Sequence, residues 1–237
     1  MCEHYVARSA SPFRLDELWE FTDRLERYGL AGFEWGVAWI DPSGKIRSHR
    51  DVRAFRDDPG REAVGQIETT AALVHLRRPS RLSTLGLPDT QPFDDPQGRY
   101  SFSHNGDLLN YKSLRSRYRN QGRLQGRADT EVGARWLEDA WRDGTPVAHM
   151  LGAFHETFGG LANLALVTSD GGAHHYAGNR ENPVFTFRLG SIGIAGTGIY
   201  SLDRSLFKFV AHGATDRRLV KLGLTISLDP GGSPTTA

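Results

Sequence analysis

The chain has 237 residues, with 29 basic and 28 acidic side chains and a net charge of +1 at pH 7. This balance gives no general attraction to nucleic acid or to anionic membranes, and a single cysteine excludes an internal disulfide or a thiolate-rich zinc site. The N-terminus lacks the regions of a signal peptide, and no apolar run reaches the roughly 18 residues of a membrane span. We therefore expect a cytoplasmic protein that binds neither nucleic acid nor membrane.

Hydrophobic periodicity and turn residues divide the chain into short strands and helices. Ser11-Pro12 is typical of a helix start, with proline in the first turn, and Gly29 is typical of a helix end. The first part of the chain predicts, in order, a strand at 3–9, a helix at 11–29, a buried strand at 35–40 and a hairpin turn at 41–44 into residues 45–49. A loop or short helix at 50–66 and a strand at 71–77 follow.

Residues 79–99 contain four prolines and predict a long loop, a kind of segment that is often functional inside a compact domain. After this loop we expect, in order, a strand at 100–104, helices at 109–120, 130–143 and 146–158, and strands at 161–168, 173–178, 184–188, 191–195, 206–212 and 217–228. Residues 230–237 are rich in Gly, Pro, Ser and Thr and predict a disordered tail. We expect one α+β domain over residues 2–229, with two sheets covered by helices.

Cys2 directly follows the initiator methionine. Because its side chain is small, we expect an aminopeptidase to remove Met1 and to leave a cysteine with both a thiol and a free α-amine. An α-amine has an unperturbed pKa of about 7.7–8.0, so it can take the thiol proton near neutral pH. A small buried structural cysteine is the ordinary alternative.

Three further segments carry polar groups where predicted strands run into loops. They are residues 75–80, 101–110 and 128–132. A thiolate that attacks a carboxamide creates an oxyanion, which the Asn105 amide and the Gly106 backbone N–H can stabilise. Arg77 offers a fork for a substrate carboxylate. Asp129, at the predicted N-cap of a helix, offers a carboxylate for an ammonium group. The ordinary alternatives are a structural ion pair for Arg77 and a helix cap for Asp129.

These residues resemble a known family, the class II glutamine amidotransferases. The resemblance is carried by Cys2, H-x-R at 75–77 with Ser80, H-N-G at 104–106, D-T-E at 129–131, WGVAW at 35–39 and Pro92-Phe93, and the chain departs from the pattern at Arg78-Pro79. It implies an N-terminal-nucleophile (Ntn) hydrolase, a four-layer αββα sandwich of two mainly antiparallel sheets. It also implies catalysis by Cys2, Asn105 and Gly106 and substrate binding by Arg77, Ser80 and Asp129, with no metal or cofactor.

The resemblance implies hydrolysis of the side-chain amide of glutamine to glutamate and ammonia. The ammonia would pass to a separate synthase or transferase subunit. One alternative is a stand-alone hydrolase of a γ-glutamyl amide, like the small family member of ergothioneine biosynthesis. Another alternative is a non-catalytic protein that binds glutamine.

Other polar residues predict supporting roles. We expect His75 and His104 to hold neighbouring loops through hydrogen bonds and not to act as acid or base. His174 and His175 are adjacent on a predicted strand and point to opposite faces, so they are not expected to share a metal ion. The arginines between residues 115 and 127 predict a solvated face or a partner-docking surface in place of a nucleic-acid site.

Overall fold

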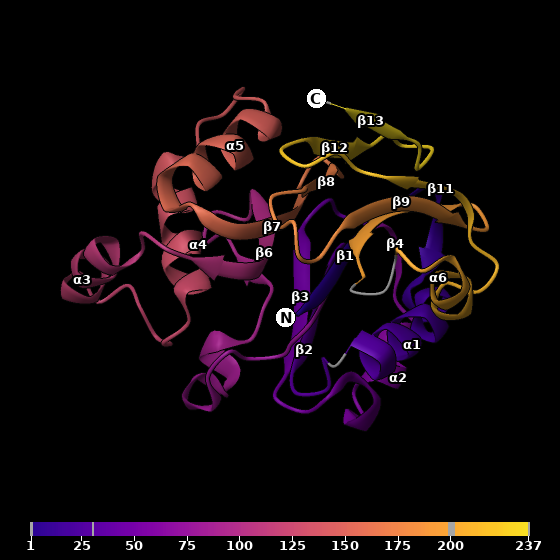
Figure 1. Ribbon diagram of the computed structural model, residues 1–237, viewed down its shortest axis with the longest axis horizontal. Coiled ribbons are helices and arrows are strands. Elements are labelled where there is room, and N and C mark those ends of the chain that lie inside the picture. The colour runs from indigo at the N-terminus through magenta and orange to yellow at the C-terminus, as the bar shows by residue number, and fades with distance from the viewer. Residues whose placement is uncertain (1, 30, 199–201, 237) are drawn as a thin grey trace.

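The computed structural model describes residues 2–29, 31–198 and 202–236. Two antiparallel β-sheets lie face to face, and helices cover the outer face of each sheet (Figure 1). The predicted α+β class and the four-layer αββα sandwich are confirmed. No helix within the described residues is long and apolar enough to cross a membrane.

The first sheet has seven strands in the order β11-β9-β10-β1-β4-β2-β3. Their bounds are β1 (Glu3–Arg14), β2 (Trp35–Ile40), β3 (Ile46–Asp51), β4 (Glu68–Leu76), β9 (Val184–Leu189), β10 (Ile192–Thr197) and β11 (Thr215–Leu219). Strand β1 lies between β4 and β10, in the middle of this sheet. Cys2 therefore directly precedes a central strand whose position is fixed on both sides.

The second sheet has six strands in the order β13-β12-β8-β7-β6-β5. Their bounds are β5 (Phe93–Asp94), β6 (Tyr100–Leu108), β7 (Gly160–Thr168), β8 (Ala173–Tyr176), β12 (Thr225–Leu228) and β13 (Pro234–Thr236). Strands β6 and β7 pair along their full length, from Tyr100 opposite Thr168 to Leu108 opposite Gly160. This long ladder fixes the end of β6 that carries Asn105 and Gly106.

Apolar side chains hold the four layers together. Three helices pack on the first sheet: α1 (Trp19–Gly29), α2 (Arg61–Gly65) and α6 (Arg204–Val210). Two helices pack on the second sheet, α4 (Asp129–Ala140) and α5 (Val147–Phe158), and α3 (Lys112–Asn120) lies beside them. Short 3-10 turns occur at Leu15–Leu18, Phe55–Asp57, Leu82–Thr84 and Leu87–Asp89. Between the sheets, small side chains such as Val6, Ala38 and Ala165 form a third buried cluster.

Ser11-Pro12 does not start a helix, contrary to the prediction. Both residues extend β1, and the helical segment begins at Leu15. The register of β1 against β4 shifts between Arg8 and Phe13. Proline is tolerated in a strand at such an irregularity, because no ladder hydrogen bond is required from its nitrogen.

The strand predicted at residues 206–212 is wrong, since this segment forms helix α6. Its alternating apolar residues resemble a strand, but the Asp203 side chain caps a helix by accepting from the backbone N–H groups of Ser205 (2.8 Å) and Leu206 (3.1 Å). Such a cap satisfies donors that a helix start leaves unpaired. The strand predicted at 217–228 is also wrong in extent, because β11 and β12 are separate strands.

The disordered tail predicted for residues 230–237 is wrong over much of its length. Residues 234–236 form β13, which pairs with β12 so that Ile226 lies opposite Thr236. Ala237 lies outside the described residues. The C-terminal segment is thus an edge strand of the second sheet.

Candidate active site

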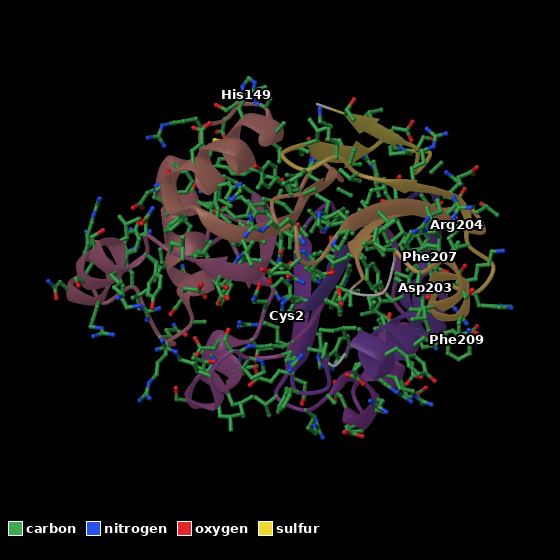
Figure 2. The ribbon with its side chains drawn as sticks, in the orientation of Figure 1. Cys2, His149, Asp203, Arg204, Phe207 and Phe209 are labelled. Atoms are coloured by element: carbon green, nitrogen blue, oxygen red, sulfur yellow. The ribbon has the colours of Figure 1, made fainter. Side chains whose placement is uncertain are left out.

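Cys2 lies on the wall of a cavity of about 660 Å³. In Figure 2 it appears near the middle of the molecule, beside the start of β1. The other walls come from the loop after β4, the end of β6 and the start of α4, which are the three polar segments singled out in the sequence. Of the predicted site residues, the structure brings Arg77, Ser80, Gly106 and Asp129 to this cavity with Cys2.

The Cys2 thiol contacts the loop after β4. The Arg78 backbone N–H donates to Sγ at 3.3 Å, and Sγ lies 3.5 Å from the Arg78 carbonyl oxygen. Burial raises the pKa of the Cys2 thiol, against the opposing effects of the Arg78 N–H and the Arg77 charge. A thiol that is neutral in this position needs a base before it can attack. Its own α-amine can be that base only after loss of Met1, which lies outside the described residues.

Asn105 and Gly106 lie inside β6 and not after a strand, contrary to the prediction. The Asn105 side-chain nitrogen donates to the Cys2 carbonyl oxygen, and its side-chain oxygen accepts from Asn179 at 3.4 Å. An amide nitrogen has two N–H groups, so one remains for another acceptor. Gly106 has φ 143°, and a Cβ there would lie 1.6 Å from the Leu161 carbonyl oxygen. Only glycine fits this position.

Arg77 is buried and forms an ion pair with Glu34, a residue that the sequence analysis did not single out. Its other terminal nitrogen donates to the Thr84 hydroxyl at 2.9 Å. The Glu34 carboxylate also accepts from the Gly86 backbone N–H. Glu34 thus fixes both the guanidinium group and the loop beside the cavity. Its position just before a buried strand was the only signal for it in the sequence.

Asp129 is the first residue of α4 and not its N-cap, which is Ala128. The Asp129 carboxylate accepts from the backbone N–H groups of Leu108 (2.7 Å) and Thr130 (2.9 Å). These two bonds hold a negative charge at the cavity wall. The Ser80 hydroxyl, on the facing loop, lies 3.4 Å from an exposed Asp107 carboxylate oxygen.

A network of buried amides lies behind Cys2, and we call it the amide network. Its members are Glu3, Asn105, Asn163, Asn179 and Asn182. The Asn182 side chain donates to the Cys2 carbonyl oxygen at 3.3 Å and to the Glu3 carboxylate at 3.1 Å. Asn163 in turn donates to the Asn182 carbonyl oxygen at 2.7 Å. This network was not predicted from the sequence, where the segment Gly178-Asn179-Arg180-Glu181-Asn182 was the available signal.

Three fully buried histidines lie between the sheets, and we call them the histidine cluster: His4, His75 and His175. The ring centroids of His4 and His175 are 4.7 Å apart. His4 Nδ1 lies 2.7 Å from the Ser103 hydroxyl, but among the described residues the other five ring nitrogens have no hydrogen-bond partner. The loop-supporting role predicted for His75 is therefore wrong. Burial lowers the pKa of His75 and of His175 to about 3 and also lowers that of His4.

His104 does support its surroundings, as predicted. One ring nitrogen lies 3.2 Å from the Leu161 carbonyl oxygen and the other lies 3.0 Å from the Thr130 hydroxyl. These contacts join β6 to β7 and to the start of α4. His174 lies on the opposite face of β8 from His175, also as predicted, with Nδ1 2.8 Å from the Ser227 hydroxyl.

One group of possible metal ligands occurs in the described part of the chain, and it is distant in the sequence from the cavity segments: His49, Asp51 and Asp58. Arg53 donates to both carboxylates, at 2.7 Å to Asp51 and 3.1 Å to Asp58. A guanidinium group therefore already neutralises the charge that would attract a cation.

The fold is shared with solved structures over the whole chain. A glutamine phosphoribosylpyrophosphate amidotransferase from B. subtilis matches with a TM-score of 0.73 at 17% identity, covering 100% of this chain and 49% of that one. A glutamine aminotransferase class-II domain protein from Silicibacter pomeroyi matches with a TM-score of 0.63 at 15% identity, covering 99% of this chain and 98% of that one. Identities this low show a shared fold and nothing beyond it.

Residues 57–154 match the family model described as "Glutamine amidotransferase domain". The matched range covers less than half of the chain, and over that range the chain is similar to this domain. The matched range contains Arg77, Ser80, Asn105, Gly106 and Asp129.

Two curated relatives are similar to parts of this chain. The glutamine–fructose-6-phosphate aminotransferase [isomerizing] of Aeropyrum pernix is 28% identical over 148 residues, 60% of this chain and 23% of the relative. The putative glutamine amidotransferase YafJ of Escherichia coli (strain K12) is 28% identical over 144 residues, 58% of this chain and 54% of the relative. The matches thus span less than a quarter of the first relative and about half of the second.

Proposed function

We propose that this chain is a class II glutamine amidotransferase, with an N-terminal cysteine that acts as an amidohydrolase on the side-chain amide of glutamine or of a γ-glutamyl compound. The observation that carries this proposal is the position of the Cys2 thiol on the cavity wall, with the Asn105 amide bonded to the carbonyl group of the same residue. Cys2, Gly106 and the charged side chains line one cavity. Asn105 is buried and not part of the cavity wall, and it contacts the site through its bond to Cys2.

The proposed reaction has two steps. After loss of Met1, the α-amine of Cys2 takes the thiol proton and Sγ attacks the amide carbon. The free N–H of the Asn105 amide and the Gly106 backbone N–H stabilise the oxyanion. The carbon–nitrogen bond breaks, the α-ammonium protonates the leaving amine, and a thioester forms. Water then cleaves the thioester with the α-amine as base, which releases glutamate and regenerates the thiol.

The substrate head is proposed to bind between Arg77 and Asp129. The pair with Glu34 does not exhaust Arg77, because a guanidinium group has five N–H donors and the bonds to Glu34 and Thr84 use only part of them. Asp129 offers its charge to the α-ammonium group. Ser80 lies in the loop that would close over the bound head.

A separate synthase or transferase subunit that receives ammonia is one version of this proposal. Hydrolysis of a larger γ-glutamyl amide is the other, and the cavity of about 660 Å³ favours it, because this volume is typical of sites for drug-sized ligands. Both versions share the same thioester chemistry. In either case we place the enzyme in the cytoplasm, where a free thiol stays reduced.

Trapping the thioester tests the proposed function. In the presence of hydroxylamine, the γ-glutamyl thioester is expected to yield γ-glutamyl hydroxamate, which is measured by its iron complex. Glutamine and a γ-glutamyl anilide should both be tried, with Cys2→Ala as the control. Hydroxamate from the unmodified chain alone supports the proposal. Binding of these ligands without any hydroxamate would favour a non-catalytic protein.

A further inference from the structure

We propose that the amine portion of the substrate carries a carboxylate, so that the preferred substrates are γ-glutamyl amides of amino acids and not glutamine. This inference rests on the proposed function and narrows its substrate class. It is carried by the size of the cavity, by the charges on its walls and by the rigidity of the backbone that bears those charges.

The cavity is larger than a single amino acid fills. Its volume of about 660 Å³ lies within the range of about 300–1,000 Å³ that is typical of sites for drug-sized ligands. Glutamine ends at its amide nitrogen, so a bound γ-glutamyl head leaves room for a further group on that nitrogen. The space therefore suits a substrate with a substantial amine portion.

Three arginine side chains line this cavity without an ionic partner. They belong to Arg78, Arg81 and Arg127, all of which are exposed. No ion pair between these arginines and a carboxylate occurs within residues 2–29, 31–198 and 202–236. Guanidinium groups bind carboxylates through two parallel hydrogen bonds, so such groups around a cavity favour an anionic ligand.

The charges of the cavity also point to one additional negative charge on the ligand. Arg77 and Glu34 neutralise each other, and the remaining carboxylates of the cavity wall are Asp107 and Asp129. Two carboxylates beside three unpaired arginines leave one positive charge. A γ-glutamyl head is neutral because it has one α-carboxylate and one α-ammonium group. The α-ammonium group of a Met1-free Cys2 adds to this positive charge, so the wall attracts a carboxylate on the amine portion.

The backbone that carries Arg127 is held in place by two carboxylates. Asp89 accepts from the backbone N–H groups of Arg127 and of the next residue, both at 2.6 Å. Glu131 accepts from the backbone N–H groups of Gln125 (2.7 Å) and Gly126 (2.9 Å). A fixed backbone lowers the entropic cost of presenting the arginine to a ligand.

A matched pair of substrates tests the inference directly. γ-Glutamylglycine and γ-glutamylglycinamide have the same size and the same γ-glutamyl head, and they differ in the carboxylate on the amine portion. We expect kcat/KM for γ-glutamylglycine to exceed that for γ-glutamylglycinamide by at least about tenfold, the effect of one charge-assisted hydrogen bond. We also expect it to exceed kcat/KM for glutamine.

Variants locate the effect. Arg81→Gln and Arg127→Gln are each expected to lower the ratio of the two kcat/KM values several-fold, because each removes a charge but leaves the Arg127 backbone bonds to Asp89 in place. Arg119→Gln, an exposed arginine on α3 that does not line the cavity, should leave the ratio unchanged.

Each contrary outcome overturns the inference in a distinguishable way. Equal rates for the two amides, or faster cleavage of glutamine, would show that the arginines do not select a carboxylate, while the proposed function would stand. Absence of cleavage of all three substrates by the Met1-free chain, together with absence of hydroxamate, would overturn the proposed function and the inference with it. An unchanged ratio in Arg81→Gln and Arg127→Gln would show that the preference arises elsewhere.

Discussion

Two buried polar groups lie near Cys2, and they differ in how well their atoms are hydrogen-bonded. In the amide network, side-chain nitrogens of Asn105, Asn163 and Asn182 all donate to backbone or carboxylate oxygens. In the histidine cluster, His75 and His175 have no partner for either ring nitrogen in the described part of the chain. Both groups are excluded from water, so this difference in pairing decides what each contributes.

The amide network and the histidine cluster are expected to have different roles: the first positions Cys2, and the second affects the free energy of unfolding. In the amide network the Asn182 side-chain oxygen has no partner among the described residues, but the amide nitrogens named above do. Such bonds hold a buried network in one arrangement, and two of its amides donate to the carbonyl oxygen of the proposed nucleophile. Unpaired neutral imidazoles contribute packing but resist protonation, since a charge in this position would have no partner. We therefore expect changes to the amide network to affect catalysis, and changes to the histidine cluster to affect stability at low pH.

The largest effect is expected from Asn105→Ala. Loss of its amide removes a proposed oxyanion donor and one bond to the Cys2 carbonyl oxygen. Removal of an oxyanion donor lowers kcat by about 10²–10³-fold in enzymes of known mechanism. Steady-state kinetics of the Met1-free chain measure this effect, with the exposed Asn120→Ala on α3 as a matched control. A loss of less than about threefold in kcat/KM would show that Asn105 has no catalytic role.

A smaller effect is expected from Asn182→Ala, which leaves the buried Glu3 carboxylate with one donor fewer. The Glu3 carboxylate keeps its bond from the Thr197 hydroxyl (2.6 Å), so the expected loss is that of one hydrogen bond to a charged group, about 1.5–3 kcal/mol. Urea unfolding at pH 7.5 should show a lower free energy of unfolding by this amount, and kcat should fall as the Cys2 carbonyl group loses a bond. Unchanged stability would mean that Asn182 does not satisfy Glu3.

The histidine cluster provides the smallest effect and a pH dependence of defined sign. The pKa of His175 is about 3 in the folded chain and about 6.5 when unfolded, so its contribution to stability is complete above pH 6.5 and is lost as pH falls towards 3. At pH 5 this loss amounts to about 2 kcal/mol. His175→Leu should remove it and flatten the decline in the free energy of unfolding between pH 7 and pH 5.

Urea unfolding at several pH values measures this decline. The exposed His212→Leu is the matched control and should follow the curve of the unmodified chain. Activity at pH 7.5 should change little in His175→Leu, because its ring does not line the cavity. Parallel stability curves for His175→Leu and the unmodified chain would contradict the account of the histidine cluster.

Much of the fold followed from local patterns. Strand β2 begins and ends where the apolar run predicts, and helix α5 differs from its prediction by one residue at its start. The errors occurred where a capping side chain or pairing with a distant strand determines the local secondary structure. Asp203 turns an alternating apolar segment into helix α6, and pairing with β12 orders a C-terminal segment whose composition predicts disorder.

Most residues of the candidate site could be predicted from the sequence, but the partners that hold them in place could not. The polar motifs named Cys2, Arg77, Gly106 and Asp129, and these residues do line one cavity. Their partners could not be read from spacing, because they come from segments far away in the chain. Glu34, which lies 43 residues before Arg77, is one such partner. The asparagines behind Cys2 were hidden for the same reason.

The most direct test of the central claim is intact mass spectrometry before and after incubation with a glutamine-mimicking diazo-ketone. Cys2 is the only cysteine of the chain, so no second thiol can take up the reagent. The account predicts a mass that lacks Met1, one added reagent group on the unmodified chain and none on Cys2→Ala. Equal labelling of Cys2→Ala, or full labelling of a chain that retains Met1, would contradict it.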